Sequence, residues 1–212
     1  MKITVFGATG GVGKNLVAQA LQRGHAVSAV VRDPARLPIS SPALTVTTVS
    51  GLEDPNRLRP ALQGSDAVLS AVGPSGRKGA AVAGPGTASI VRAMQATGTE
   101  RLVAVSAAPI GPVPPGESLL TRRLILPVLT TVLHNVYNDL AEMEAELERS
   151  HIAWTVVRPP KLTNRPLTGI YRTTLGGNVP RGSAISRADV AHLMLTALNQ
   201  PAAVRQAIGI AY

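Results

Sequence analysis

Three glycines near the N-terminus have the spacing that a phosphate-binding loop requires. Gly7, Gly10 and Gly13 follow a short apolar stretch and precede a helical pattern of apolar residues. In this context the first glycine permits a tight turn, the second lets the backbone approach a pyrophosphate, and the third allows close packing of helix on strand. Free N–H groups at the start of the helix then face the phosphates. The loop predicts a dinucleotide site, to which Thr9 and Val12 also contribute.

Two other interpretations of this loop exist. The pair Gly13-Lys14 mimics the end of a nucleotide-triphosphate loop, in which four residues separate a first glycine from the pair and Ser or Thr follows it. The chain has Ala8 and Asn15 at those positions, so this interpretation is rejected. A glycine-rich turn that has lost its ligand stays open as the alternative.

The end of the second predicted strand distinguishes between the two nicotinamide cofactors. An acidic residue there would bind the ribose 2'-hydroxyl of NAD(H), whereas an arginine accommodates the 2'-phosphate of NADP(H). The first side chain beyond Val31 is Arg32, and Arg36 and Lys14 could add positive charge nearby. Guanidinium groups make charge-assisted, often bidentate bonds to phosphate. NADP(H) is therefore predicted, although Arg32 could also be a solvated loop residue.

Further contacts are expected where other strands end, because ligands of open parallel sheets lie at that edge. The cofactor contacts predicted there are Leu52, Ala71, Val72, Gly73, Ser106 and Pro159. The Ser106 hydroxyl would face the nicotinamide, unless it bonds its own backbone. Lys161 could bind an anionic group of an acceptor, unless it is simply solvated. Ser106 and Lys161 are the candidate catalytic residues, and no metal site is predicted.

The elements that position these residues alternate between strands and helices. Strands are predicted at 2–6, 26–31, 44–49, 67–72, 101–106, 154–158 and 204–210, with an extended piece at 169–174. Helices are predicted from Val12 to Gly24, at 58–62 and 87–96, on either side of Pro127, and at 187–199. This alternation predicts an α/β fold with a Rossmann-type, doubly wound parallel sheet in three αβα layers. We expect one domain over 1–212, with a small substrate region at about 107–135 and 159–186.

Two local patterns refine this prediction. The helix after Pro127 is expected to carry Glu142, Glu144, Glu146 and Glu148 on its solvent side. Ser186, with Asp189 three residues later, matches the capping-box pattern. We therefore predict that the main role of both residues is to begin the helix at 187–199.

Composition excludes several classes of protein. The 212 residues include no cysteine, which excludes disulfide frameworks and thiol catalysis. The net charge of +9 is spread along the chain without interleaved aromatic residues, so nucleic-acid binding is not predicted. The stretch Leu119–Leu133 is interrupted by Arg122, Arg123 and Pro127, so no membrane span is expected. We expect a cytoplasmic protein, either a monomer or a weak homodimer.

With these residues in place, the chain resembles the atypical short-chain dehydrogenases, a single-domain NAD(P)H-binding group. Within that group it is most similar to the NADPH-dependent flavin reductases, also called biliverdin reductase B. The resemblance covers nearly the whole chain. It rests on Gly7-Ala8-Thr9-Gly10, Val31-Arg32-Asp33 with Arg36-Leu37-Pro38, Gly64-Ser65-Asp66-Ala67-Val68, Pro159-Pro160, Pro166-Leu167-Thr168-Gly169 and Ile185-Ser186-x-x-Asp189.

The chain also departs from these relatives. Ordinary short-chain dehydrogenases pair a Tyr with a Lys four residues later. Four residues after Tyr137 this chain has Ala141, so Tyr137 is interpreted as a packing residue. The resemblance implies two histidines where this chain has Leu140 and Lys161. It also implies an Asp near the adenine, where Gly51 is followed by Leu52.

The missing acid pair points to one class of acceptor. Flavins accept hydride directly, so the protein need only stack the two rings and exclude water. A flavin, quinone or tetrapyrrole acceptor is therefore predicted over an alcohol or ketone. Two alternatives are a non-catalytic NADP(H) sensor, with Leu119–Leu133 as its partner surface, and an epimerase or isomerase relative.

Overall fold

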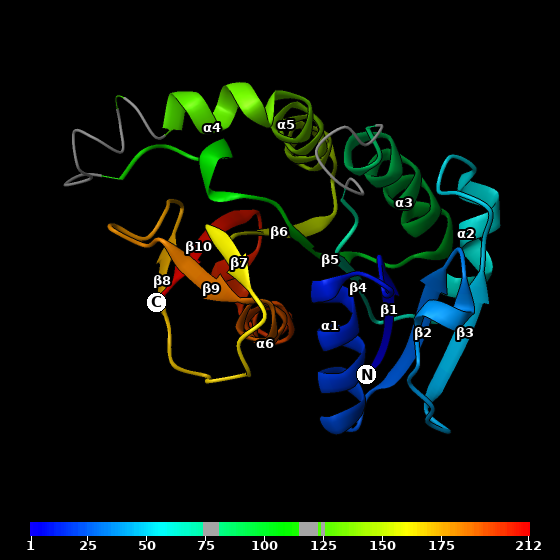
Figure 1. Cartoon of the computed structure of the whole chain (residues 1–212). Helices are drawn as coiled ribbons and strands as arrows, with labels where there is room; N and C mark the ends of the chain where they lie inside the picture. The colour runs from blue at the N-terminus through cyan, green and yellow to red at the C-terminus, as the bar shows by residue number, and fades with distance from the viewer. Residues whose placement is uncertain (74–80, 115–122, 124–125) are drawn as a thin grey trace.

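A twisted eight-stranded sheet organises the chain in the computed structural model, which describes residues 1–73, 81–114, 123 and 126–212 (Figure 1). The strand order is β3-β2-β1-β4-β5-β6-β10-β8. Every neighbouring pair is parallel except β10 and β8, which are antiparallel. The strands are β1 (Lys2–Phe6), β2 (Ala26–Val31), β3 (Leu44–Thr48), β4 (Ala67–Ser70), β5 (Arg101–Val105), β6 (Ala153–Arg158), β8 (Arg172–Leu175) and β10 (Gln206–Ala211).

Helices cover both faces of this sheet. One face carries α1 (Gly11–Gln22) and α6 (Arg187–Ala197), which pack on each other. The other face carries α2 (Pro55–Leu62), α3 (Ala83–Thr97) and α5 (His134–Arg149), with α3 between its two neighbours. Two separate apolar clusters, one on each face, bury the aliphatic side chains of the strands. The predicted single-domain, three-layer Rossmann architecture is confirmed.

A small second sheet lies outside this framework. Strands β7 (Lys161–Thr163) and β9 (Ala184–Ser186) pair in parallel. The sequence analysis did not predict either strand, because three residues are too few to show a period. The predicted extended piece at 169–174 corresponds to β8, shifted by up to three residues.

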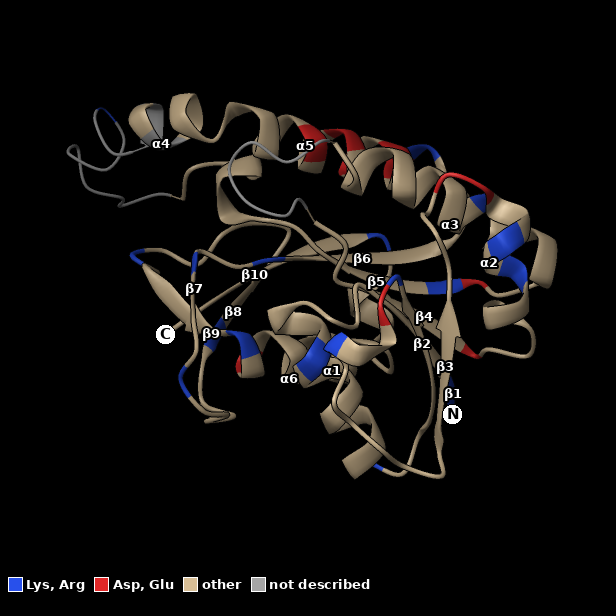
Figure 2. Cartoon of the chain, turned by 45° about the vertical axis from the view of Figure 1, so that its right-hand side comes forward, with Lys and Arg blue, Asp and Glu red and all other residues tan. Residues whose placement is uncertain are grey.

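Helix α5 corrects one prediction. Glu144 is buried, and its carboxylate forms an ion pair with Arg158 at the end of β6. Successive helical residues are about 100° apart, so residues two apart lie on opposite sides, and four alternate glutamates cannot share one face. Figure 2 shows a run of acidic residues along α5; Glu142 and Glu148 are exposed.

Two helix boundaries also differ from prediction. Helix α3 begins at Ala83 rather than Thr87. Pro127 lies in the first turn of α4 (Leu126–Val132), so the two described helices in this region are α4 and α5, not one on either side of that proline. Residues 115–122 and 124–125 are outside the described part, which includes much of Leu119–Leu133. Within the described residues, no helix is long and apolar enough to cross a membrane.

Candidate functional site

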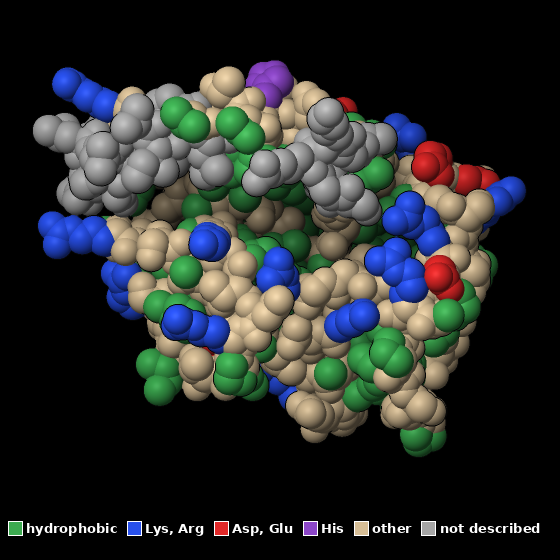
Figure 3. All heavy atoms as spheres, in the orientation of Figure 1, with side chains coloured by type: hydrophobic (Ala, Val, Ile, Leu, Met, Phe, Trp, Pro, Cys, Tyr) green, Lys and Arg blue, Asp and Glu red, His purple; other side chains and the backbone are tan. Residues whose placement is uncertain are grey.

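A cavity of about 410 Å³ follows the edge of the sheet where the parallel strands end. Its lining comes from the loops after β1, β2, β3 and β4 and from the start of α3. The lining residues are Gly7, Thr9, Gly10, Val30, Val31, Arg32, Arg36, Val49, Ser50, Gly51, Leu52, Glu53, Ala71, Val72, Gly73, Ala81, Val82, Pro85 and Gly86. Figure 3 shows this face, with Lys and Arg side chains gathered around a hollow. Eight predicted cofactor contacts therefore share one cavity.

The predicted tasks of the glycines agree with the geometry of the loop. Gly7 has a φ of +70°, and a Cβ there would overlap the carbonyl of Ala71, the residue directly after β4. A Cβ on Gly13 would overlap the Gly7 carbonyl oxygen, so this glycine lets α1 approach the loop closely. Gly13 and Val12 are buried under the loop and lie outside the cavity lining. Only glycine, which has no Cβ, allows this tight junction of strand, loop and helix.

The start of α1 has no side-chain cap. Its N-cap residue is Gly10, and no side chain accepts a hydrogen bond from the first turn. The first N–H groups of a helix lack intrahelical partners and carry the positive end of the helix dipole. Since Gly10 lines the cavity, these donors are available to an anion there. This arrangement fits the pyrophosphate of a dinucleotide.

The start of α3 borders the same cavity but is closed by a carboxylate. Asp139 of α5 accepts hydrogen bonds from the N–H groups of Val82 (3.0 Å), Ala83 (2.9 Å) and Gly84 (2.8 Å). Its side chain is only 3% exposed. The role of Asp139 cannot be predicted from the sequence, because nothing local links position 139 with residues 82–84.

The end of β2 supplies the positive charge predicted for it. Arg32 and Arg36 both line the cavity, and neither guanidinium has a hydrogen bond or ion pair among the described residues. Asp33 forms no ion pair with Arg32 among the described residues; its carboxylate accepts from the N–H of Ala35 at 3.0 Å. Lys14, the third predicted cation, is exposed and is not part of the lining.

The loop after β3 brings an unpredicted acid to the same cavity. Glu53 lines it, and its carboxylate lies where a Cβ on Gly51 would be. Glu53 is one position beyond Leu52, the position at which the resemblance implies an Asp. Beside it, Arg57 Nη1 donates to Ser50 Oγ at 2.9 Å. The Glu53 side chain therefore reaches the cavity by turning back over Gly51.

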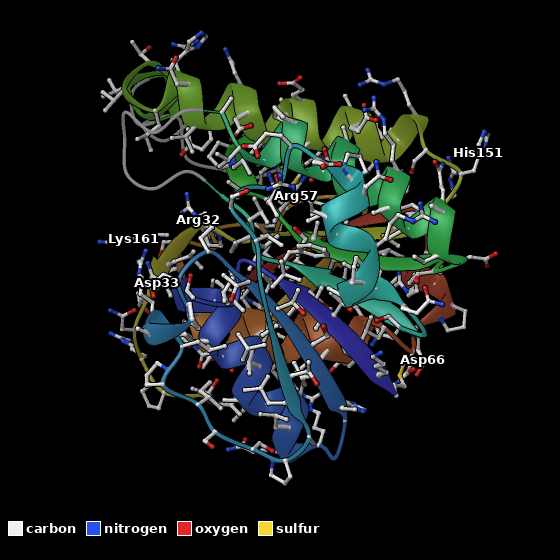
Figure 4. The ribbon with its side chains drawn as sticks, turned by 90° about the vertical axis from the view of Figure 1, so that its right-hand side faces the viewer. Arg32, Asp33, Arg57, Asp66, His151 and Lys161 are labelled. Atoms are coloured by element: carbon white, nitrogen blue, oxygen red, sulfur yellow. The ribbon has the colours of Figure 1, made fainter. Side chains whose placement is uncertain are left out.

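The remaining predicted residues lie further along the same edge, at the ends of β5 and β6. Ser106, Pro159 and Lys161 are not part of the cavity lining. Ser106 is 7% exposed, and its Oγ has no hydrogen-bond partner among the described residues, so it does not bond its own backbone. Figure 4 places Arg32 and Lys161 on the same side of the molecule, opposite Asp66 and His151. Lys161 is exposed.

Hydrogen bonds hold the loops after β5 and β6 together. The Ala108 N–H donates to the Pro159 carbonyl at 2.8 Å. Asn178 Nδ2 donates to the carbonyls of Ala108 (2.7 Å) and Pro112 (3.1 Å). The Arg158–Glu144 ion pair lies directly before Pro159 and fixes α5 against β6. Segments from three parts of the chain thus form one rigid wall beside Ser106.

Asp189 does more than begin a helix. It accepts hydrogen bonds from Ser186 Oγ, Tyr212 Oη, Thr168 Oγ1 and the N–H groups of Thr168 and Gly169. Burial alone would raise the pKa of Asp189, but these hydrogen bonds outweigh burial and lower it. The N–H of Ser186 donates to Tyr212 Oη instead of to Asp189, so only half of the predicted capping box forms. The carboxylate ties the loop at 168–169 to α6.

Tyr137 is partly buried against the apolar cluster of α3 and α5, as its interpretation as a packing residue requires. Burial raises the pKa of its hydroxyl. Within the described ranges, no group of His, Asp or Glu side chains is arranged to hold a metal ion.

The uncapped glycine turn, the cavity along the strand ends and the parallel sheet define a dinucleotide-binding protein of Rossmann type. The chain belongs to the NAD(P)H-binding family, which it matches over residues 7–201. A chloroplastic protein of Arabidopsis thaliana, itself uncharacterised, is 34% identical over 211 residues, covering 94% of this chain and 72% of the relative.

Two solved structures share the fold. A short-chain dehydrogenase/reductase of Veillonella parvula, in complex with NADP, has a TM-score of 0.80 at 22% identity and covers 100% of this chain and 94% of its own. An anaerobilin reductase of Escherichia coli O157:H7 has a TM-score of 0.80 at 19% identity, with 100% and 97% covered. At these identities the likeness concerns the fold.

Proposed function

We propose that this protein is an NADPH-dependent reductase that passes hydride to a flavin, quinone or tetrapyrrole-type acceptor. The observation that carries the proposal is that Arg32 and Arg36, two cations without a partner among the described residues, line the same cavity as Gly10 at the uncapped start of α1. A guanidinium pair favours a ribose 2'-phosphate over a hydroxyl, so NADPH is preferred to NADH.

The acceptor class follows from a missing pair of side chains. Four residues after Tyr137 the chain has Ala141, so Tyr137 lacks the lysine with which ordinary short-chain dehydrogenases protonate a carbonyl substrate. Bound NADPH would supply a hydride, and a flavin or quinone would take up that hydride together with a proton from solvent. The chain's own task is then to align two rings and exclude water. The rigid wall formed by Ala108, Pro159 and Asn178 supports that task.

The remaining assignments belong to the same proposal. Ser106 would orient the nicotinamide amide or the acceptor through its unpartnered hydroxyl, and Lys161 would attract an anionic acceptor. The substrate region would comprise residues 107–135 and 159–186, and the protein would act in the cytoplasm. Lys161→Ala should then weaken turnover of flavin phosphate more than that of riboflavin; equal effects would remove Lys161 from the site.

The test is oxidation of NADPH by the purified protein with riboflavin, flavin phosphate and a quinone, and with NADH as the control. We expect turnover that favours NADPH and is lost in Arg32→Glu. Tight NADPH binding without turnover on any acceptor would contradict the reductase proposal and favour the NADP(H) sensor. Absence of binding would contradict the cofactor assignment itself.

A further inference from the structure

The glycine loop contains one glycine that the dinucleotide pattern does not require. Gly7, Gly10 and Gly13 account for the turn, the approach of the phosphate and the helix packing, but Gly11 has none of these tasks. Gly11 is the first residue of α1 and has no left-handed backbone angle. Alanine would be expected to favour the helix there by up to about 1 kcal/mol, so a glycine needs another reason.

The reason lies in α6. A Cβ on Gly11 would be 2.5 Å from Cδ and 2.7 Å from Nε of Arg187, the first residue of α6. A side chain at position 11 would force the Arg187 side chain to shift, so in this structure Arg187 crosses the start of α1 through space that the glycine leaves open. Helices α1 and α6 lie side by side in Figure 2, with basic residues on both.

The Arg187 guanidinium is held in place but keeps most of its donors. Nη1 donates to Asn164 Oδ1 at 2.6 Å, and no other hydrogen bond or ion pair of Arg187 exists among the described residues. Arg101 shows the opposite case: its guanidinium donates to the carbonyls of Ala153 (2.7 Å) and Ala197 (2.7 Å) and to other oxygens. Arg101 is thus a structural residue, whereas Arg187 is a positioned cation with free donors.

We propose that Arg187, which lies outside the cavity lining but against Gly11 at the uncapped start of α1, binds the pyrophosphate of the dinucleotide together with the N–H groups of α1, and that Gly11 is present to admit it. The inference rests on the proposed cofactor site and deepens it. Arg32 and Arg36 bind the 2'-phosphate at one end, and Arg187 binds the pyrophosphate that NADPH and NADH share. Through Asn164, the same side chain connects the cofactor with the loop that follows β7.

The test is isothermal titration with three ligands: NADPH, NADH, and adenosine 2'-phosphate, which lacks the pyrophosphate. Arg187→Ala should weaken NADPH and NADH by the same factor, roughly tenfold for one charge-assisted contact, and leave adenosine 2'-phosphate unchanged. Arg32→Ala should show the converse pattern, with NADPH and adenosine 2'-phosphate weakened and NADH unchanged. Arg92→Ala removes an exposed arginine of α3, on the opposite face of the sheet from α1 and α6, and is the control for general loss of charge.

Gly11→Ala provides an independent test, because it displaces Arg187 without removing its charge. This variant should fold with unchanged or higher thermal stability and should lose the same factor of NADPH affinity as Arg187→Ala. The double variant should lose no more than either single variant. Additive losses, or an Arg187→Ala protein with the affinities of the Arg92→Ala control, would overturn the inference. Failure of the wild-type protein to bind either dinucleotide would instead overturn the proposed function.

Discussion

Two helices begin at the same cavity, and their starts are treated in opposite ways. The first turn of α1 has a glycine N-cap and no side-chain acceptor, whereas three N–H groups at the start of α3 bind the buried carboxylate of Asp139. Both helix starts attract negative charge through the same dipole. The protein supplies its own anion at α3 and leaves α1 for an anion from outside. The comparison supports the proposed phosphate site at the start of α1 and shows which part of the cavity wall the protein's own side chain holds in place.

The largest effect is expected when the carboxylate at the start of α3 is removed. Asp139→Ala should lower the free energy of unfolding by about 3 kcal/mol, because three N–H groups lose their acceptor in a buried place. Urea denaturation measures this loss. Asp54→Ala is the matched control, since Asp54 caps α2 at an exposed position through one N–H, that of Asn56. It should cost about 1 kcal/mol. Equal costs for the two variants would contradict the role given to Asp139.

Saturating the external site should sharpen the comparison. NADPH at a hundred times its Kd should raise the free energy of unfolding by about 2.7 kcal/mol. Amide hydrogen exchange should slow at Gly11–Gly13, whose donors gain an acceptor. It should change little at Val82–Gly84, where the donors are already bonded. Protection that appears first at the α3 start would reverse the assignment.

Removing positive charge from the cavity should affect binding but not folding. Arg32→Ala should weaken NADPH by about tenfold, or about 1.4 kcal/mol, while NADH affinity stays the same. The exposed Arg32 has no partner among the described residues, so stability without cofactor should change by less than about 0.5 kcal/mol. Competition titrations and thermal unfolding measure the two effects. If Arg32→Ala weakened NADH as much as NADPH, Arg32 would not be the residue that recognises the 2'-phosphate.

The smallest effect near neutral pH concerns a third helix start. Asp189 at α6 has a lowered pKa in the folded protein, so its contribution to stability is complete above its unfolded pKa of about 3.9. That contribution is lost only as the pH falls through the lower, folded value. Unfolding followed between pH 8 and pH 2 should show no contribution of Asp189 to the slope above about pH 5. In Asp189→Asn the free energy of unfolding should fall less steeply at low pH, because this carboxylate is absent. The same fall in both proteins below about pH 4 would contradict the prediction.

The sequence predicted the N-terminal half of the site well. The turn from β1 into α1 and the position of Arg32 after β2 depend on residues within a few positions of one another. Local rules therefore suffice for them: glycine at tight turns, apolar periods for strands and helices, and a ligand edge where strands end. The same rules predicted the sheet, and eight of the residues predicted to contact the cofactor line one cavity.

The sequence could not predict contacts between residues far apart along the chain. Glu144 was assigned to solvent because its neighbours in sequence are charged, yet it pairs with Arg158 across the α5–β6 contact. Ser186 and Asp189 were interpreted as a local cap, yet Tyr212 and Thr168 also converge on that carboxylate.

By itself, then, the sequence determined the fold class, the glycine turn and the cation at the end of β2, because short-range backbone geometry and apolar periodicity encode them. Only the tertiary structure decided that Asp139 closes α3 and that Arg187 lies over Gly11. Each of these contacts joins elements more than 50 residues apart, and the packing of helices on a common sheet brings them within hydrogen-bond or van der Waals distance. No local pattern records which distant side chain will fill the space that a glycine leaves.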